Sequence, residues 1–216
     1  MTVTDVALLQ EQAAEFGCEL PRDRAEHLVA YTDAMLAENR YINLTAVRDR
    51  AAALVFHALD SLALGSAEFA LAPESCLDIG TGNGFPGVAI ACLFPDAHVV
   101  LMDRTLKKLK AIERALVASS FDMDRISTVQ MDAAEAPAHG HLYKYDLITA
   151  RAVKPLETMG VLASPLLKRE GRLLCWLSAD TEAPDALPEK LRKHAELEYH
   201  LPEPADRVRR LVSYGP

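Results

Sequence analysis

The amino-acid sequence predicts an α/β fold: a mostly parallel sheet that ends in an antiparallel closing strand and follows an N-terminal helical extension. Two observations support this prediction. Only helical periodicity occurs over residues 5–64, and strand-like runs alternate with helical stretches beyond the loop around Pro73. Alternation of this kind is typical of a parallel sheet with helices on both faces. We therefore expect one globular unit, with a helical extension over residues 1–66 packed on an α/β domain over residues 67–216.

The extension is expected to be helical throughout, because apolar residues recur there at helical spacing. These residues are Val6, Leu9 and Ala13, then Leu28, Tyr31, Met35 and Leu36, and finally Leu54, Val55, Ala58, Leu59 and Leu62. No segment of the extension has the pattern of a strand.

The α/β domain is expected to alternate between short strands and longer helices. The predicted strands cover residues 76–79, 98–102, 126–131, 145–149 and 172–177, and the predicted helices cover 86–94, 104–118 and 155–168. The tail predicts a helix near 184–195, then strands at 197–201 and 210–214 that form an antiparallel edge hairpin across a turn at 202–206.

Length and charge narrow the class of protein. The 216 residues suffice for a sizeable core, and 23 Lys and Arg against 31 Asp and Glu give a net charge of −8. That charge does not favour a duplex-DNA or membrane-surface protein, so a polyanionic partner must bind a local patch. No apolar run approaches the roughly 18 residues of a membrane span, and the N-terminal residues 1–5 do not begin a signal peptide. We expect a cytoplasmic monomer.

The four cysteines are expected to be reduced thiols in the core. Cys18, Cys76, Cys92 and Cys175 stand far apart and form no C-x-x-C pair. A disulfide or a zinc site is the less favoured alternative, and we expect no metal.

The glycine-rich loop at residues 77–87 is the most informative segment. From Gly82 it spells G-x-G-x-x-G, with Asp103 where an acid would bind ribose hydroxyls, a pattern that an NAD(P) oxidoreductase would share. From Asp78 it spells D-x-G-x-G-x-G. A carboxylate there would repel a pyrophosphate and favour a ligand with an ammonium and a sulfonium. We therefore expect S-adenosylmethionine as the cofactor.

Other polar residues are expected near the same crevice. The segment 132–135 follows the third strand and could meet an adenine edge, although Asp132 could equally cap a helix. Arg151 ends the fourth strand, where it could meet a methionine carboxylate or an RNA phosphate, with a surface ion pair as the alternative. His57 and Asp60 lie one helical turn apart. They could order the crevice mouth or meet RNA, and the alternative is that they cap and brace the N-terminal helices against the sheet.

Positive charge and aromatic side chains offer candidate RNA contacts. The charges are Arg104, Lys107, Lys108, Lys110 and Arg114 on one predicted helix, Arg40, Arg48 and Arg50 near the extension, and Arg207, Arg209 and Arg210 in the tail. The predicted helix also carries a buried stripe of Leu106, Leu109, Ile112 and Leu116, so its lysines could be only a solvated face. Tyr41, Phe56 and Tyr143 could stack on bases.

Several motifs together resemble one known family. They are Asn-Leu-Thr-Ala at 43–46, His-Ala-Leu-Asp-Ser-Leu at 57–62, the glycine loop at 77–87, Leu-Met-Asp at 101–103 followed by Lys107 and Lys108, and Thr-Ala-Arg-Ala at 149–152. In this order they are similar to the motifs of the bacterial glucose-inhibited division protein B family. The resemblance covers roughly residues 25 to 177.

The resemblance implies a fold, an activity and a set of site residues. The fold is the Rossmann-like class I S-adenosylmethionine-dependent methyltransferase fold, and the family methylates N7 of a guanine in the 530 loop of 16S ribosomal RNA, in the 30S subunit or its precursor. The resemblance implies that the cofactor-binding residues include Gly80, Phe85, Asp103, Ala133, Ala134, Glu135 and Arg151. The pattern of the glycine loop adds Asp78, Gly82 and Gly84. The substrate-side candidates are Asn43, His57, Asp60 and Arg151. We expect no catalytic acid or base, because N7 attacks through its own lone pair and needs mainly positioning. A methyltransferase for a small molecule is the alternative.

Overall fold

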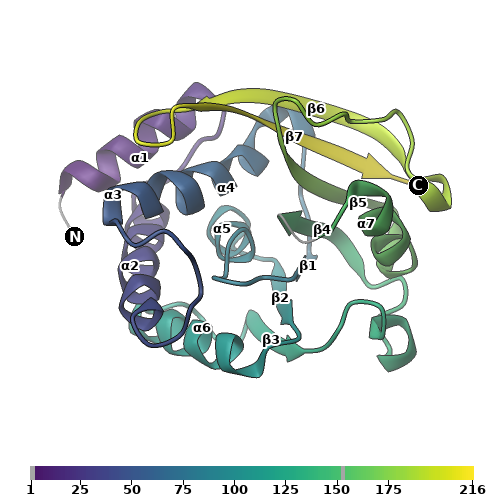
Figure 1. The fold of residues 1–216 in the computed structure, drawn as a ribbon, viewed down its shortest axis with the longest axis horizontal. Coiled ribbons are helices and arrows are strands. Elements are labelled where there is room, and N and C mark those ends of the chain that lie inside the picture. Colours follow the sequence, from purple (N-terminus) through teal and green to yellow (C-terminus); the bar gives the residue numbers. More distant parts are fainter. Residues whose placement is uncertain (1–2, 152–153) are drawn as a thin grey trace.

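The computed structural model describes residues 3–151 and 154–216 (Figure 1). Met1 and Thr2 of the N-terminal segment and Ala152 of the 149–152 motif lie outside the described residues. Within these residues a seven-stranded sheet has the order β3-β2-β1-β4-β5-β7-β6. The predicted mostly parallel sheet with an antiparallel closing strand is confirmed, since β7 alone runs opposite to the other strands of the sheet.

The strands are short in the parallel part of the sheet and longer at its antiparallel edge. Their bounds are β1 Ser75–Ile79, β2 His98–Asp103, β3 Ile126–Gln130, β4 Tyr145–Arg151, β5 Leu167–Ser178, β6 Arg192–Leu201 and β7 Arg207–Gly215. Residues 76–79 of β1 are all buried, as expected for a central parallel strand that is covered on both faces.

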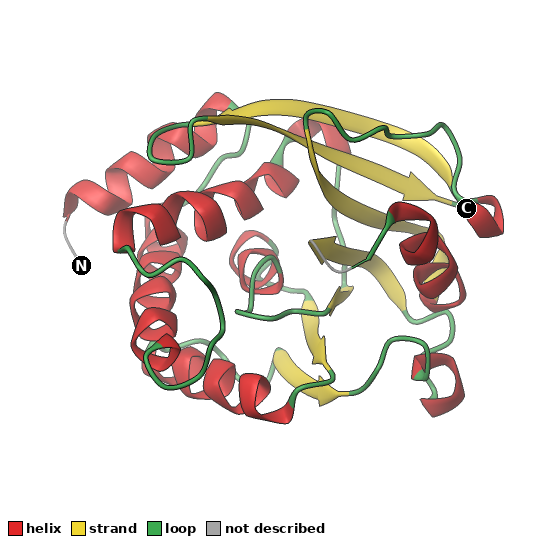
Figure 2. Cartoon of the chain, in the orientation of Figure 1, coloured by secondary structure: helices red, strands yellow, loops and turns green. Residues whose placement is uncertain are grey.

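Helices cover both faces of the sheet (Figure 2). The helices are α1 Val3–Glu15, α2 Arg22–Asn39, α3 Arg50–Ala53, α4 Asp60–Leu62, α5 Gly87–Leu93, α6 Leu106–Ala118 and α7 Leu156–Ala163. A π-helical segment, Leu54–Leu59, joins α3 to α4, and short 3-10 turns complete the connections at residues 63–65, 67–69, 136–139, 164–166 and 188–190.

Two apolar cores lie on opposite sides of the sheet. One contains buried residues of α1, α2, α5 and α6, and the other contains those of α7. Because side chains alternate along a strand, Cys76 belongs to the first core and Leu77 to the second. The first core runs without interruption from Val6 in the extension to Leu211 in β7. The boundary at residue 66 therefore stays a prediction.

Helix α6 shows how the sequence pattern produces the packing. Leu109, Ile112 and Leu116 recur on one helical face and are buried, and α6 packs against α2. Leu106 was expected in the same stripe, but 44% of its surface is exposed, because it lies in the first turn, beyond the contact with the core.

Two predicted helices differ from the structure. The segment 184–195 is not a helix: a 3-10 turn spans 188–190, and β6 begins at Arg192 and pairs with β7. Pro184 and Pro188 remove backbone donors that a helix would need. The predicted helix 155–168 ends at Ala163, because Pro165 follows and Leu167 already begins β5.

The extension also departs from a continuous helix. Residues 40–49 form a loop between α2 and α3, fixed by side-chain hydrogen bonds rather than by helical ones. The helix after the glycine loop starts at Gly87 and not at Pro86, which occupies the position before its first residue. The predicted edge hairpin of β6 and β7 is confirmed.

All four cysteines are free and buried, as predicted. Burial raises the pKa of each thiol to about 12, so these groups stay protonated and behave as small apolar side chains. Across residues 3–151 and 154–216, the His, Cys, Asp and Glu side chains form no group of three that could hold a metal ion. No helix in the described part of the chain combines the length and apolarity needed to cross a membrane.

Candidate functional site

The glycine loop turns sharply at the carboxyl end of β1. Gly80, Gly82 and Gly84 have φ angles of +66°, +58° and +93°, a region that favours glycine. At Gly84 a Cβ atom would lie 2.0 Å from the hydroxyl oxygen of Tyr31, so glycine is required for helix α2 to approach the loop. The Tyr31 hydroxyl donates to the carbonyl oxygen of Asn83 at 2.9 Å. The extension thus supports the loop directly.

Asp78 lies beneath this loop and is fully buried. Its carboxylate accepts hydrogen bonds from the Thr149 hydroxyl at 2.8 Å and from the Gly87 backbone N–H at 3.2 Å. Burial raises the pKa of this carboxyl to about 6, against the opposing effect of these donors. Asp78 therefore links β1 to β4 and to the start of α5 through hydrogen bonds. It does not line the cavity at the carboxyl ends of the strands.

A cavity of about 360 Å³ opens at the carboxyl ends of β1 to β4. Its wall combines apolar side chains, the Gly80 backbone, two acids and four basic side chains. The lining residues are Ile79, Gly80, Met102, Asp103, Arg104, Thr105, Lys108, Met131, Asp132, Ala133, Arg151, Lys154 and Leu162. This position and volume are typical of a ligand site in an α/β sheet.

Asp103 links the cavity to the glycine loop. One carboxylate oxygen accepts from the Gly82 N–H at 3.2 Å and the other from the Thr105 N–H at 2.8 Å. Asp103 ends β2 and is 8% exposed, so its carboxylate is held in a fixed orientation at the cavity wall.

The segment after β3 contributes only part of what the sequence predicted. Ala133 lines the cavity, whereas Ala134 and Glu135 do not. Asp132 also lines it and accepts from the Ala134 N–H at 3.1 Å, so it caps a turn. The apolar wall of the cavity was not predicted, because in the sequence Met131 has the pattern of the last apolar residue of a strand.

Arg151 belongs to a buried ion-pair cluster around Asp60. Arg151 Nη1 lies 3.1 Å from one Asp60 oxygen, and Arg209 Nε lies 3.2 Å from the other. The Tyr199 hydroxyl donates to Asp60 at 2.6 Å, and the Trp176 indole N–H donates to its carbonyl oxygen at 2.8 Å. Asp60 thus joins the extension to β4, β5, β6 and β7, as in the bracing alternative, while Arg151 still reaches the cavity.

His57 is a neutral link between the 40–49 loop and the glycine loop. Its Nε2 lies 2.9 Å from the Thr45 hydroxyl, and its ring stacks on Phe85 with centroids 6.3 Å apart. Burial, and then the Arg151 charge, lower the pKa of His57 to about 3. Phe85 itself is buried against Tyr31 and does not line the cavity.

Asn43 does not join this group, since it is exposed on the loop. The buried asparagine is Asn39, whose side-chain oxygen accepts from the backbone N–H groups of Leu44 and Thr45. Asn39 precedes the 40–49 loop and Asn43 lies within it. The sequence offers no local signal that distinguishes the buried asparagine from the exposed one.

Several of the basic side chains proposed for RNA contact already have a partner. Arg209 pairs with Asp60, Arg210 with Glu196, and Arg114 with Glu38. The Arg207 guanidinium lies 4.8 Å from the centroid of the Phe56 ring and covers that aromatic face. Among the aromatic candidates, Tyr41 and Tyr143 are 84% and 70% exposed.

Comparison with known proteins decides the family. Residues 24–207 match the family model described as rRNA small subunit methyltransferase G. The chain belongs to this family. It is 34% identical over 179 residues to ribosomal RNA small subunit methyltransferase G of Chloroflexus aggregans, covering 81% of this chain and 72% of that protein. The relative of the same name from Leptothrix cholodnii is 35% identical over 182 residues, covering 81% and 77%. The family predicted from the motifs is therefore confirmed.

Solved structures with low sequence identity share the fold of this methyltransferase G family member. A crystal structure of MtNAS in complex with MTA and tNA matches with a TM-score of 0.57 and 12% identity, over 98% of this chain and 75% of that one. A predicted O-methyltransferase from Agrobacterium tumefaciens matches with a TM-score of 0.52 and 20% identity, over 65% and 72%. The predicted Rossmann-like class I methyltransferase fold is confirmed.

Proposed function

We propose that this chain transfers a methyl group from S-adenosylmethionine to N7 of a guanine in the 530 loop of 16S ribosomal RNA. The observation that carries the proposal is the family match over residues 24–207. The relatives of this chain are named for methylation of small-subunit ribosomal RNA, and the choice of N7 and of the 530 loop rests on the resemblance of the motifs. The 30S subunit or its precursor is the proposed partner of a monomeric, cytoplasmic enzyme.

The residues of the cavity fit S-adenosylmethionine. Ile79, Met102 and Met131 offer an apolar wall suited to an adenine ring. The Asp103 carboxylate keeps free lone pairs for ribose hydroxyls beside its two backbone donors. Arg151 offers a cation for the methionine carboxylate.

The proposed methyl transfer requires no acid or base from the protein. When bound, S-adenosylmethionine supplies an electrophilic methyl group on its sulfonium. Guanine N7 carries a lone pair and no proton at neutral pH, so the reaction requires no general base. His57 and Asp60 are committed to Thr45 and to the arginine cluster, which is consistent with a positioning role for both. The enzyme's contribution is then orientation and exclusion of water.

The proposal is tested on ribosomal subunits that lack the modification. Purified protein, methyl-labelled S-adenosylmethionine and 30S subunits from a deletion strain are incubated, and the RNA is digested and analysed by mass spectrometry. We expect one 7-methylguanosine in the 530-loop fragment, and borohydride with aniline should cleave the RNA at that guanine. Binding of S-adenosylhomocysteine without any methylation of RNA would contradict the proposal and favour a small-molecule methyltransferase.

Replacing Asp103 with alanine is expected to weaken S-adenosylhomocysteine binding by roughly ten-fold to a hundred-fold. A hydrogen bond to a charged acceptor contributes about 1.5–3 kcal/mol, and Asp103 also orients the Gly82 N–H. Isothermal titration calorimetry measures the change. The matched control is Asp122→Ala, because Asp122 likewise accepts from the backbone N–H two residues later, but on an exposed turn. Equal affinities for the two variants would show that Asp103 is only structural.

A further inference from the structure

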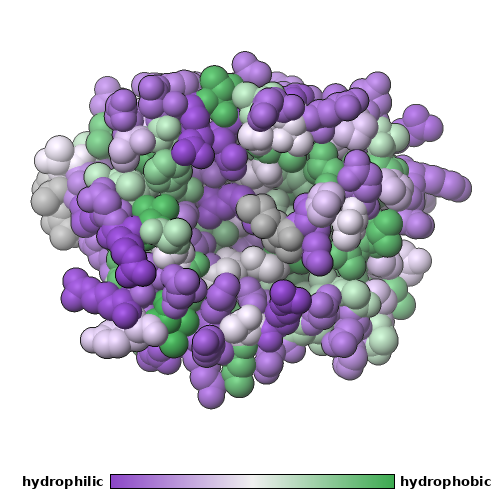
Figure 3. Space-filling model, viewed as in Figure 1, coloured by the Kyte–Doolittle hydropathy of each residue, from purple (hydrophilic) through white to green (hydrophobic). Residues whose placement is uncertain are grey.

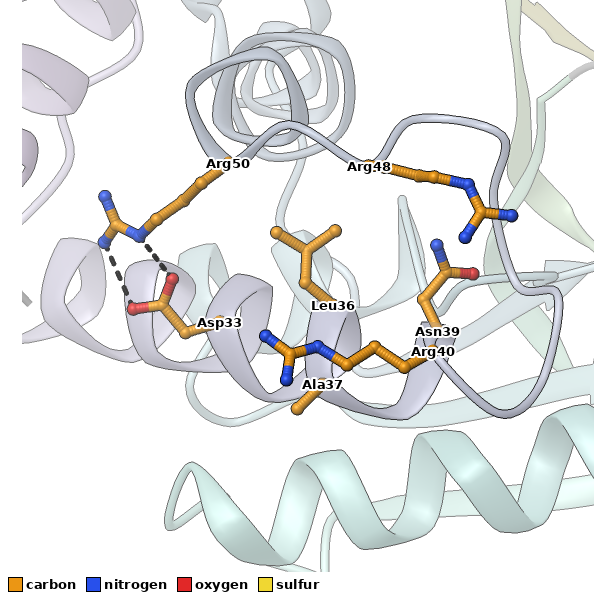
Figure 4. Close-up of a pocket in the computed structure, with 7 residues that line it drawn as sticks. All are labelled: Asp33, Leu36, Ala37, Asn39, Arg40, Arg48 and Arg50. Carbon is orange, nitrogen blue, oxygen red and sulfur yellow. Dashed lines mark hydrogen bonds and ion pairs between the residues drawn. The ribbon is translucent and has the colours of Figure 1, made fainter.

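A second cavity, of about 420 Å³, lies outside the proposed cofactor site, between the end of α2 and the 40–49 loop (Figure 4). Three arginines line it: Arg40 follows α2, Arg48 lies on the loop and Arg50 begins α3. Among the described residues, Asp33 is the one acid of its wall. The wall therefore has a surplus of positive charge in a protein whose net charge is −8.

The three arginines are not equivalent. The Arg50 guanidinium donates hydrogen bonds to both carboxylate oxygens of Asp33, at 2.5 and 3.1 Å, and to one carboxylate oxygen of Asp5, at 3.0 Å. Figure 4 shows Arg50 turned to Asp33, with no such contact drawn for Arg40 or Arg48. Both of these side chains are exposed, and neither is within ion-pair distance of an acid in residues 3–151 and 154–216. Two guanidinium groups are thus left to meet an external anion.

The loop that carries Arg48 has a fixed conformation and is linked through side chains to the glycine loop. The buried Asn39 holds it through three hydrogen bonds, to the N–H groups of Leu44 and Thr45 and to the Thr45 carbonyl. Thr45 contacts His57, whose ring stacks on Phe85 of the glycine loop. A ligand held by this loop therefore lies at a defined place relative to the proposed methyl donor, at little cost in loop ordering.

We propose that Arg40 and Arg48 bind backbone phosphates of the RNA strand whose guanine enters the cofactor cavity. This inference rests on the proposed function. Guanidinium groups bind phosphate oxygens through paired N–H donors, and a protein of net negative charge needs such a local site to hold a polyanion. Figure 3 shows hydrophilic side chains interspersed with hydrophobic ones on the face that Figure 1 presents.

Tyr41 extends the site from phosphates to bases. It follows Arg40 directly, and 84% of its surface is exposed. An exposed aromatic ring beside a phosphate-binding cation is the arrangement on which single-stranded bases stack. The site thus binds a single strand, with Arg40 and Arg48 on its phosphates and Tyr41 on a base.

The test measures binding of a short fluorescein-labelled oligouridylate by anisotropy at several salt concentrations. For the double variant R40E/R48E we expect affinity to fall about ten-fold or more. The slope of log affinity against log salt should flatten by about 1.4, since each phosphate contact to a single strand contributes roughly 0.7. The neutral variant R40Q/R48Q should show the same change in slope. Tyr41→Ala should lower affinity without changing the slope.

The matched control is R169E/R192E, which changes the charge equally. Arg169 lies in β5 and Arg192 begins β6, both exposed and at the amino-terminal edge of the sheet, away from the cavity. An R40E/R48E variant that binds RNA as well as this control would overturn the inference. So would displacement of the oligouridylate by inorganic phosphate at an equal phosphate concentration, because the site would then take free phosphate.

Failure of the inference and failure of the proposed function give different results. S-adenosylhomocysteine should bind R40E/R48E as it binds the unaltered protein, whereas methylation of 30S subunits by the variant should show a raised KM and a nearly unchanged kcat. If the unaltered protein fails to methylate 30S subunits, the proposed function is wrong, and the oligouridylate measurement still decides whether Arg40 and Arg48 bind RNA.

Discussion

Replacing Gly82 with valine is expected to lower the affinity for S-adenosylhomocysteine at least a hundred-fold while the chain stays folded. Gly82 has a φ angle of +58°, which a β-branched residue adopts only with strain. Its N–H also donates to Asp103, so a displaced loop disturbs both Gly80 and Asp103 at the cavity wall. A hundred-fold loss corresponds to roughly 2.8 kcal/mol, near the upper end of what one hydrogen bond to a charged group contributes. We expect a loss of this size because the backbone and the acid shift together.

The fold should survive this change, because the nearest atom to a Cβ at Gly82 is the Gly80 carbonyl oxygen, at 3.7 Å. Gly140→Val is the matched control. Gly140 has a φ angle of +81°, and a Cβ there meets no atom within 4 Å. Both variants should lose about 1–2 kcal/mol of stability in urea unfolding. Calorimetry should find weakened binding only for Gly82→Val, and normal binding by that variant would mean that the loop does not hold the cofactor.

The glycine loop was predictable because its signal is local. Positive φ angles demand glycine at Gly80, Gly82 and Gly84 whatever packs nearby, and an acid at the end of the next strand must lie beside that loop in a parallel sheet. The strand–helix alternation likewise predicts parallel strands joined by right-handed crossovers. The sequence therefore located the cavity and Asp103 in advance, although their role in binding stays a prediction.

The cluster around Asp60 could not be predicted, because its members meet only in the folded chain. Arg151 is 91 residues from Asp60, and Arg209 is 149 residues away. No periodicity links such positions. The error at 184–195 has the same origin: the segment carries charges at spacings that suit an exposed helix, but an available edge of β7 and two prolines make it a turn and a strand. Tertiary pairing outweighed local propensity.

Replacing Asp60 with alanine is expected to destabilise the protein by about 3–5 kcal/mol, since removing one partner leaves buried charge uncompensated. The Asp60 side chain is 4% exposed, and those of Arg151 and Arg209 are 12% and 18% exposed, so water can replace the carboxylate only in part. Tyr199 would lose its acceptor as well. Asp60→Asn should cost less, because the amide oxygen still accepts one of these hydrogen bonds. Urea unfolding monitored through Trp176 fluorescence measures both losses.

Glu38→Ala provides the comparison, because it breaks an ion pair of the same kind at the surface. Arg114 Nη2 lies 2.5 Å from Glu38 Oε2, but the Glu38 and Arg114 side chains are 21% and 55% exposed. Exposed ion pairs of this kind contribute at most about 1 kcal/mol to stability. If Asp60→Ala loses no more stability than Glu38→Ala, then water solvates Arg151 and Arg209 and the cluster does not brace the extension. A loss several times larger would mean that the buried Asp60 carboxylate fixes the positions of the extension, of the closing strands and of Arg151 at the cavity.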